Sequence, residues 1–251
     1  MKRILIALWF LALLLGRECF AQNGQKQFAL PAQDSISTLK SLSVWATQYY
    51  IHQFNSGGKI PLLYVNGQSS NLYADTCNFC KAALEGTAWV KDSSGKTVVL
   101  NFAGRGEKAQ VDCRKCAAYS ASKLAVEEWG KVRWKISSGF GTGVKNYKLI
   151  PYRTIAVDKA IIPYGTVVYV PSVRGMLVEL PNGQKVKHDG YFFAGDTGSA
   201  IKGNHVDVFT GIFSGNPFPG FIASRSSGLV DVFIIEDKAM SEALHLEHKT
   251  K

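Results

Sequence analysis

A mainly β fold is the architecture that this sequence predicts, on three observations. Glycine is frequent, at 24 of 251 residues. The apolar runs are short and are separated by turn-forming residues, as is typical of strands. Beyond the N-terminus, a persuasive helical pattern occurs only at 119–129, with a second candidate at 238–248. About 230 residues follow the N-terminal segment, which is room for one sizeable β domain or two small ones.

The first 21 residues have the pattern of a secretory signal peptide. A basic start precedes a twelve-residue apolar run at 4–15, and small residues lead to a cleavage point after Ala21. The run is too short for a membrane-spanning helix, so an uncleaved anchor is the weaker alternative. A lipid anchor at Cys19 is disfavoured because a charged pair stands directly before it. We therefore expect an exported protein without stable membrane insertion after cleavage.

The chain is basic, and this bears on its partners. Its formal net charge of +10 becomes +8 once residues 1–21 are removed, since they carry three basic residues and one acidic residue. Outside the cytoplasm the plausible anionic partners are cell-wall polymers and membrane headgroups. No motif for nucleic-acid binding is present, so we expect no nucleic-acid partner.

The first half of the chain predicts one strand followed by an insertion. Residues 22–43 are polar and aperiodic, and we expect a leader that is partly disordered. Residues 44–51 are rich in aromatic and β-branched side chains, which favours the first strand of a main domain spanning 44–236. A break at 55–58 is followed by a region of shorter apolar runs, about 59–130, which we interpret as an insertion. Residues 237–251 are expected to form a C-terminal helix or tail.

All four cysteines beyond the signal segment lie in this insertion. They form two CxxC pairs, Cys77 with Cys80 and Cys113 with Cys116. Such pairs would indicate a zinc site in a cytosolic protein. Export favours two disulfides instead, in any of three pairings. Thioredoxin-like redox chemistry is disfavoured because neither pair follows a strand and opens a convincing helix.

The second half predicts several further strands. Candidate runs end at residue 157 and cover 166–171, a hairpin at 176–187 with Asn-Gly in its turn, and a last strand at 228–235. Asp158 opens the loop between the first two runs. A carboxylate there is well placed to accept backbone N–H groups, so its structural interpretation is a turn or cap residue.

Residues 190–211 concentrate the candidate chemistry of the chain. Two strand-like runs flank a tight turn, and each delivers one aspartate, Asp196 and Asp207. In the second run a period of two places Val206 and Val208 in a core and Asp207 on the opposite face. A solvent-exposed carboxylate on a surface strand is the alternative for an aspartate in such a pattern.

These segments together resemble a known family. The runs AVDKAIIPYGTVVYV and AGDTGSAIKGNHVDVFTG look like the three-aspartate (3D) domain shared by membrane-bound lytic transglycosylase A and by stationary-phase survival and resuscitation-type muralytic proteins. The three aspartates of that pattern fall on Asp158, Asp196 and Asp207. The likeness is close over 152–211. It is looser at Ala-Thr-Gln-Tyr of the first strand, which includes Thr47 and Tyr49.

What the resemblance implies is a six-stranded double-psi β-barrel with the small cysteine-containing insertion after its first strand. Its cleft would bind a glycan strand of peptidoglycan, and Asp207 would be the single catalytic acid and base, supported by Asp196 and Asp158. The implied activity is that of a lytic transglycosylase, which cleaves the MurNAc–GlcNAc β-1,4 bond and leaves a 1,6-anhydro end. Such an enzyme would work in the periplasm or outside the cell, associated with the wall.

The side-chain chemistry is compatible with this activity. Glycosidic cleavage requires a proton donor for the leaving oxygen, and one carboxylic acid suffices when the sugar's own C6 hydroxyl attacks. For that role the pKa of Asp207 must be raised by burial or by the charge of Asp196. A hydrolase on the same barrel and a wall-binding module without turnover are the alternatives.

Four neighbours are candidates for substrate binding, each with a structural alternative. Lys202 would hold a substrate oxygen, or pair with Asp196, or simply be solvated. His205 lies on the same face of the strand as Asp207 and would contact substrate. A hydrogen bond from its ring to the backbone is an equally good interpretation. Thr47 and Tyr49 point the same way along the first strand, where an aromatic is more often core. We expect no metal site and no cofactor, and we expect a monomer.

Overall fold

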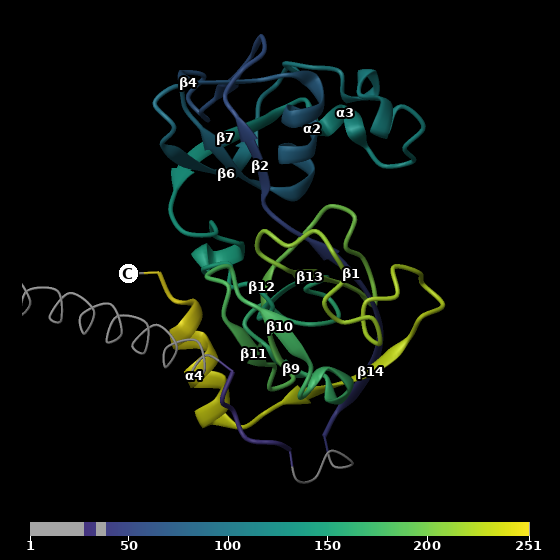
Figure 1. The fold of residues 1–251 in the computed structure, drawn as a ribbon. Coiled ribbons are helices and arrows are strands. Elements are labelled where there is room, and N and C mark those ends of the chain that lie inside the picture. The colour runs from purple at the N-terminus through teal and green to yellow at the C-terminus, as the bar shows by residue number, and fades with distance from the viewer. Residues whose placement is uncertain (1–27, 34–38, 251) are drawn as a thin grey trace, which may run out of the picture.

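The computed structural model describes residues 28–33 and 39–250. The expected signal peptide, residues 1–21, lies outside the described residues, as does part of the expected leader. The described chain forms two bodies, a β-barrel and an insertion above it in the view of Figure 1. Among the described residues, no helix combines the length and the apolar character needed to cross a membrane.

Six strands close into a barrel, which confirms the predicted fold class. Around the barrel the order is β1 (Ser41–Tyr49), β13 (His205–Phe209), β8 (Thr154–Val157), β12 (Tyr191–Asp196), β9 (Val167–Tyr169) and β14 (Val230–Ile235). The pairs β1/β13 and β8/β12 are parallel, and the other neighbours are antiparallel. A closed mixed barrel of this kind is consistent with the double-psi topology.

The alternation of side chains along these strands separates the barrel core from the candidate site. Val206 and Val208 are 2% and 0% exposed and belong to the main apolar cluster of the barrel. Asp207 lies between them in sequence and points to the other face, because successive residues of a strand alternate. The first strand begins at Ser41 and ends at Tyr49, which is earlier at both ends than the predicted 44–51.

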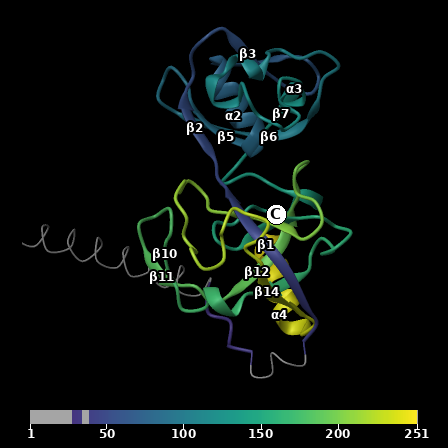
Figure 2. The same cartoon turned by 90° about the vertical axis from the view of Figure 1, so that its right-hand side faces the viewer.

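The insertion has its own sheet and its own core. Its elements are β2 (His52–Asn55), β3 (Ile60–Leu63), β4 (Ser69–Ala74), α2 (Thr76–Glu85), β5 (Thr87–Lys91), β6 (Thr97–Arg105), η2 (Cys113–Lys115), η3 (Ala117–Tyr119), α3 (Val126–Trp129) and β7 (Val132–Ser137). The main sheet has the order β2-β5-β6-β7, and β3 and β4 form a hairpin. Figure 2 shows β1 running upward from the barrel directly into β2. The insertion therefore joins the barrel through residues 50–51 and 138–153.

Helix α2 corrects the sequence-based interpretation of this region. Asp75 caps its N-terminus by accepting a hydrogen bond from the backbone N–H of Asn78, and Gly86 ends it in the left-handed conformation. The first CxxC pair thus follows a strand and does open a helix. In contrast, most of the predicted helix at 119–129 is irregular, and only Val126–Trp129 is α-helical.

The four cysteines form two disulfides between the CxxC pairs rather than within them. Cys77 is bonded to Cys116, and Cys80 is bonded to Cys113. The expected disulfides are confirmed, and of the three pairings that the sequence left open the structure has the nested one, in which Cys80–Cys113 lies within the loop closed by Cys77–Cys116. Both bonds join the N-terminal half of α2 to the segment at η2. The bonded arrangement leaves no free thiol pair for zinc or for thioredoxin-like exchange among these four residues.

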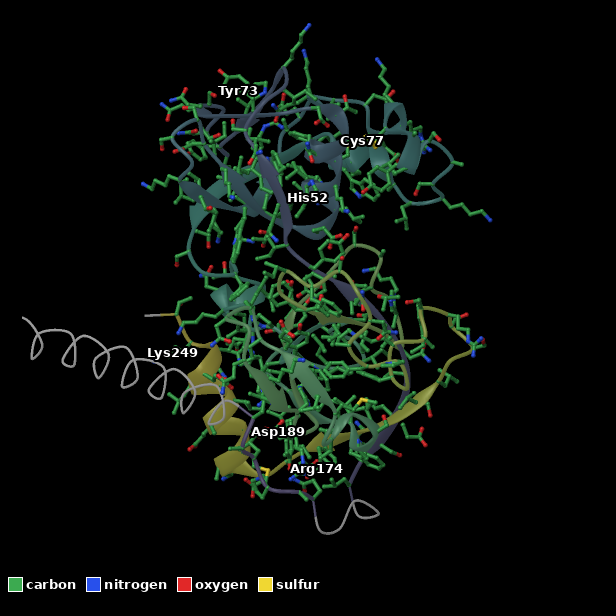
Figure 3. All side chains as sticks on the ribbon, in the orientation of Figure 1. His52, Tyr73, Cys77, Arg174, Asp189 and Lys249 are labelled. Atoms are coloured by element: carbon green, nitrogen blue, oxygen red, sulfur yellow. A yellow bond between two sulfur atoms is a disulfide. The ribbon has the colours of Figure 1, made fainter. Side chains whose placement is uncertain are left out.

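The lower end of the barrel is closed by segments from both ends of the chain. Part of the expected leader is ordered there, because Phe28 is 5% exposed and the backbone N–H of Leu30 donates to Asp189. Asp189 also pairs with the fully buried Arg153, at 2.7 Å. Figure 3 shows Asp189 and Arg174 at this end. The C-terminal helix α4 (Lys238–His248) packs beside β9 and β12 (Figure 1). The small hairpin of β10 (Leu177–Glu179) and β11 (Lys185–Lys187) completes the domain.

Candidate active site

A cavity of about 600 Å³ lies between the barrel and the insertion. The barrel supplies Asp207 from β13, Asp196 at the end of β12, Tyr49 at the end of β1, and the loop 197–202. The insertion supplies the end of α2 and residues of β6 and β7. Because two bodies form its walls, the cavity depends on how the insertion packs against the barrel.

Asp207 lies in the wall of this cavity with one oxygen held by β1. The parallel pairing of β1 with β13 places Thr47 opposite Asp207, and the Thr47 hydroxyl lies 2.6 Å from Oδ1. Burial raises the pKa of the Asp207 carboxyl to about 7, and the charges of Glu85 and Asp196 add to the increase. A hydrogen bond that Thr47 donates to the ionised carboxylate opposes this increase. Asp207 therefore retains its proton to near neutral pH.

Asp196 lies in the same cavity with both oxygens held by donors. The Tyr49 hydroxyl donates to Oδ2 at 2.7 Å, and the backbone N–H of Thr197 donates to Oδ1 at 2.8 Å. Burial raises the pKa of Asp196 to about 6, although these two donors oppose the increase. Burial also raises the pKa of the Tyr49 hydroxyl, with help from the charge of Asp196. Asp196 thus has two fixed donors that favour its ionised form, whereas Asp207 has one.

Glu85 is a third carboxyl in this cavity, and sequence reasoning missed it. It is the last residue of α2, and its Oε2 accepts a hydrogen bond from the backbone N–H of Tyr50 at 3.0 Å. Burial raises the pKa of Glu85 to about 7. The helix C-terminus before Gly86 was a readable signal, but its approach to the barrel depends on long-range packing that no local pattern contains.

Asp158 is not brought into this cavity. Its oxygens accept hydrogen bonds from the backbone N–H groups of Ala160, at 3.0 Å, and Gly203, at 2.9 Å. These donors lower the pKa of Asp158 below its usual range. Its position matches the turn carboxylate that we considered from the sequence, and it ties the loop before β13 to the end of β8. Lys202, next to Gly203, lines the cavity and forms no ion pair among the described residues.

His205 and Thr47 stand behind Asp207 rather than in the open cavity. His205 is 8% exposed, and its ring is stacked on Trp45 with the ring centroids 3.6 Å apart. Its Nε2 lies 2.8 Å from the hydroxyl of Thr47. Of the four predicted substrate-binding residues, Tyr49 and Lys202 line the cavity and the other two support Asp207.

The arrangement can deliver a proton at near-neutral pH to a group bound in the cavity. Asp207 is the better donor, because Asp196 has two fixed donors that stabilise its ionised form. The described residues contain no cluster of three or more histidine, cysteine or acidic side chains suited to a metal ion. A second cavity of about 630 Å³ lies beside residues 138–151, but its lining contains no carboxyl group.

Comparison with known proteins adds a family match over part of the chain and a shared fold. Residues 153–215 match the family described as the 3D domain, which confirms the predicted resemblance. The match includes β8, β12 and β13 and therefore all three aspartates of the pattern. No curated protein sequence matches the chain.

Two solved structures share the overall fold. The crystal structure of Escherichia coli MltA with bound chitohexaose has a TM-score of 0.50 and 19% identity, covering 76% of this chain and 71% of that one. A membrane-bound lytic murein transglycosylase from Agrobacterium tumefaciens has a TM-score of 0.50 and 14% identity, covering 80% of this chain and 76% of that one. At these identities the similarity establishes a common fold.

Proposed function

We propose that this protein is an exported lytic transglycosylase that cleaves the MurNAc–GlcNAc β-1,4 bond of peptidoglycan and forms a 1,6-anhydro product. The observation that carries the proposal is Asp207, a carboxyl with a pKa of about 7 in the wall of the cavity between barrel and insertion. The 3D-domain match and the fold shared with lytic transglycosylases support this choice of reaction.

The first step would be proton transfer from Asp207 to the glycosidic oxygen. The bond between the anomeric carbon and that oxygen breaks as the proton arrives, and the positive charge that develops on the sugar is oxocarbenium-like. The carboxylate produced in this step stabilises the neighbouring positive charge.

The second step would use the same residue as a base. The C6 hydroxyl of the sugar attacks its own anomeric carbon, and Asp207 takes the hydroxyl proton, so the enzyme regains its starting state without water. A carboxyl with a pKa near 7 suits both directions of transfer, because its proton affinity is close to the working pH. No second catalytic carboxyl is needed.

Asp196 would act as a charged neighbour rather than as a general base. Both of its oxygens accept hydrogen bonds, which stabilise the ionised carboxylate and make it a weaker base. Its negative charge raises the pKa of Asp207 and would stabilise the positive sugar. This arrangement favours the transglycosylase over a hydrolase that uses Asp196 as its base.

Location and partner follow from the same proposal. Two disulfides are typical of proteins in oxidising compartments, which favours the periplasm or the cell exterior. The basic charge of the chain would favour contact with an anionic wall. Glycan strands of peptidoglycan are the proposed substrate, and we expect the protein to act as a monomer.

Product analysis of digested sacculi tests the reaction. Mass spectrometry of the soluble products should find 1,6-anhydro muropeptides. Reducing ends would indicate a hydrolase, and the absence of any release would indicate a binding module, so either outcome would overturn the proposal.

A matched pair of variants tests the assignment of the acid. Asp207→Asn should abolish product release while binding to sacculi persists. Asp231→Asn is the control, because Asp231 is also a barrel aspartate that accepts a hydroxyl hydrogen bond from β1, at 2.6 Å from Ser43, but it is exposed and outside the cavity. Full activity of Asp207→Asn would refute the assignment.

A further inference from the structure

We propose that His205 is a positioning residue that acts on Asp207 through the hydroxyl of Thr47, favouring the protonated acid. The inference rests on the proposed function, in which Asp207 gives up and recovers a proton. The three side chains form a continuous chain, with 2.6 Å between Asp207 Oδ1 and Thr47 Oγ1 and 2.8 Å between Thr47 Oγ1 and His205 Nε2.

The surrounding structure holds this chain in place. Thr47 stands opposite Asp207 in the parallel pairing of β1 with β13, and Trp45 stands opposite His205. The indole and imidazole rings are stacked with an angle of 6° between their planes. The other ring nitrogen, Nδ1, lies 3.4 Å from the backbone carbonyl oxygen of Ala200. His205 therefore has a defined neighbour at each nitrogen.

The Ala200 carbonyl selects one tautomer of the neutral imidazole. A carbonyl oxygen can only accept, so Nδ1 must carry the proton for this contact to be a hydrogen bond. Nε2 is then an acceptor and draws the single hydroxyl proton of Thr47 toward itself. The Thr47 oxygen can in turn accept a proton from Asp207. Every group is satisfied in this arrangement only when Asp207 is protonated.

Ionisation of Asp207 reverses the direction of the hydrogen bonds that join Asp207, Thr47 and His205. The carboxylate requires a donor, so the Thr47 hydroxyl turns to Oδ1, and Thr47 then offers only a lone pair to His205. A neutral His205 must place its proton on Nε2 to match, which leaves the lone pair of Nδ1 facing the Ala200 carbonyl. One contact is lost in the ionised state, and this loss raises the proton affinity of Asp207.

Among the residues that the structure describes, no charged group near this hydrogen-bond chain is an alternative partner for His205. Asp207 on β13 reaches it only through Thr47, while Asp196 on β12 and Glu85 on α2 act on Asp207 across the cavity. Lys202 precedes it in the turn and meets it through its backbone carbonyl. Burial lowers the pKa of His205, which favours the neutral ring that this mechanism uses.

The consequence for the reaction concerns its second step. After Asp207 has protonated the leaving oxygen, the three side chains lack one hydrogen bond until the C6 hydroxyl returns a proton. This missing hydrogen bond raises the proton affinity of Asp207 and so favours it as the base of that step. No proton leaves the three residues other than the one that Asp207 donates and recovers.

Imidazole nitrogen shifts measured by NMR test the inference without any turnover. In the ¹⁵N-labelled protein, His205 should be the Nδ1–H tautomer below pH ~7, and its nitrogens should titrate together with Asp207. Asp207→Asn should hold the Nδ1–H tautomer at all pH values, because its amide donates to Thr47 as the protonated acid does. Thr47→Val should abolish the linked titration. An Nε2–H tautomer at low pH, or an unchanged titration in Thr47→Val, would refute the inference.

The pH dependence of kcat/KM provides the second test. His205→Phe retains a ring against Trp45 but removes the competing acceptor, so the Thr47 hydroxyl is free to donate to Asp207. We expect the alkaline limb to move to lower pH by about one unit, which corresponds to roughly tenfold less activity above pH 7, with KM little changed. The single variant Thr47→Ser should retain the wild-type limb because it keeps the hydroxyl. An unchanged alkaline limb in a folded His205→Phe variant would also refute the inference. Absence of anhydro product from the wild type would instead refute the proposed function, and the NMR result would remain valid.

Discussion

Replacement of Asp207 by asparagine should stabilise the protein at neutral and alkaline pH. The carboxyl has a pKa of about 7 in the folded protein against an ordinary value of 3.8. The folded state thus binds the proton more tightly than the unfolded state, and stability falls as the pH rises from about 4 to about 7. Asparagine has no charge to bury and should not show this loss.

The magnitude follows from the size of the increase. A change from 3.8 to about 7 corresponds to about 4 kcal/mol at pH 8 as an upper limit. Solvent screening reduces the cost of the buried charge, so we expect a gain of about 2 kcal/mol for Asp207→Asn. The same variant should lose product release, so the group that limits stability would be the group that performs catalysis.

Guanidinium chloride unfolding with intact disulfides measures the effect. Wild type and Asp207→Asn should be nearly equal in free energy of unfolding at about pH 4 and should diverge up to about pH 8. Asp158→Asn is the control of opposite sign, because backbone donors lower the pKa of Asp158 and its ionised form stabilises the fold above that pKa. An equal gain for Asp207→Asn at both pH values, or no gain at pH 8, would refute the reasoning.

Three further predictions concern the walls of the cavity and the insertion. Glu85→Gln removes a charge that raises the pKa of Asp207, so the alkaline limb of the pH–rate profile should move to lower pH; an unchanged limb would exclude that coupling. Gly143→Ala should reduce kcat, because a Cβ there would lie 2.3 Å from the carbonyl oxygen of Gly195 and 2.9 Å from the carboxyl of Asp196. Gly220→Ala is the control, because a Cβ at Gly220 would meet nothing within 4 Å. Reduction of both disulfides should lower the melting temperature, since each native disulfide contributes about 2–4 kcal/mol; calorimetry with and without reductant checks this, and an unchanged melting temperature would contradict it.

The barrel was predictable because its information is local. Alternation of Val206 and Val208 with Asp207 assigns faces to a strand without knowledge of its neighbours, and the turn residues between runs mark where strands end. The motif around Asp158, Asp196 and Asp207 indicated the fold. It did not indicate that one aspartate braces a loop while the other two line a cavity, because that distinction depends on which backbone groups and side chains meet each carboxyl.

The insertion was less predictable because its structure depends on long-range contacts. The local pattern did not predict the helix that contains Cys77 and Cys80, and no spacing rule selects the nested pairing. The segment at 119–129 has a helical pattern that packing realises only in its last turn. Glu85 belongs to the cavity because α2 lies against residues 50–51, a contact between parts of the chain 35 residues apart.

Helix α2 links the nested disulfides to the cavity by its length. Cys80 fixes the rotation of the helix about its axis, and Glu85 follows five positions later on the same rigid element. One inserted residue between them would turn Glu85 by about 100° and advance it by about 1.5 Å, which would take its carboxyl away from Tyr50. The disulfides at the N-terminal half of the helix thus fix its rotation, and this rotation determines where the Glu85 carboxyl lies at the other end. The distance between cysteine and glutamate along the chain is therefore as much a part of the site as the glutamate itself.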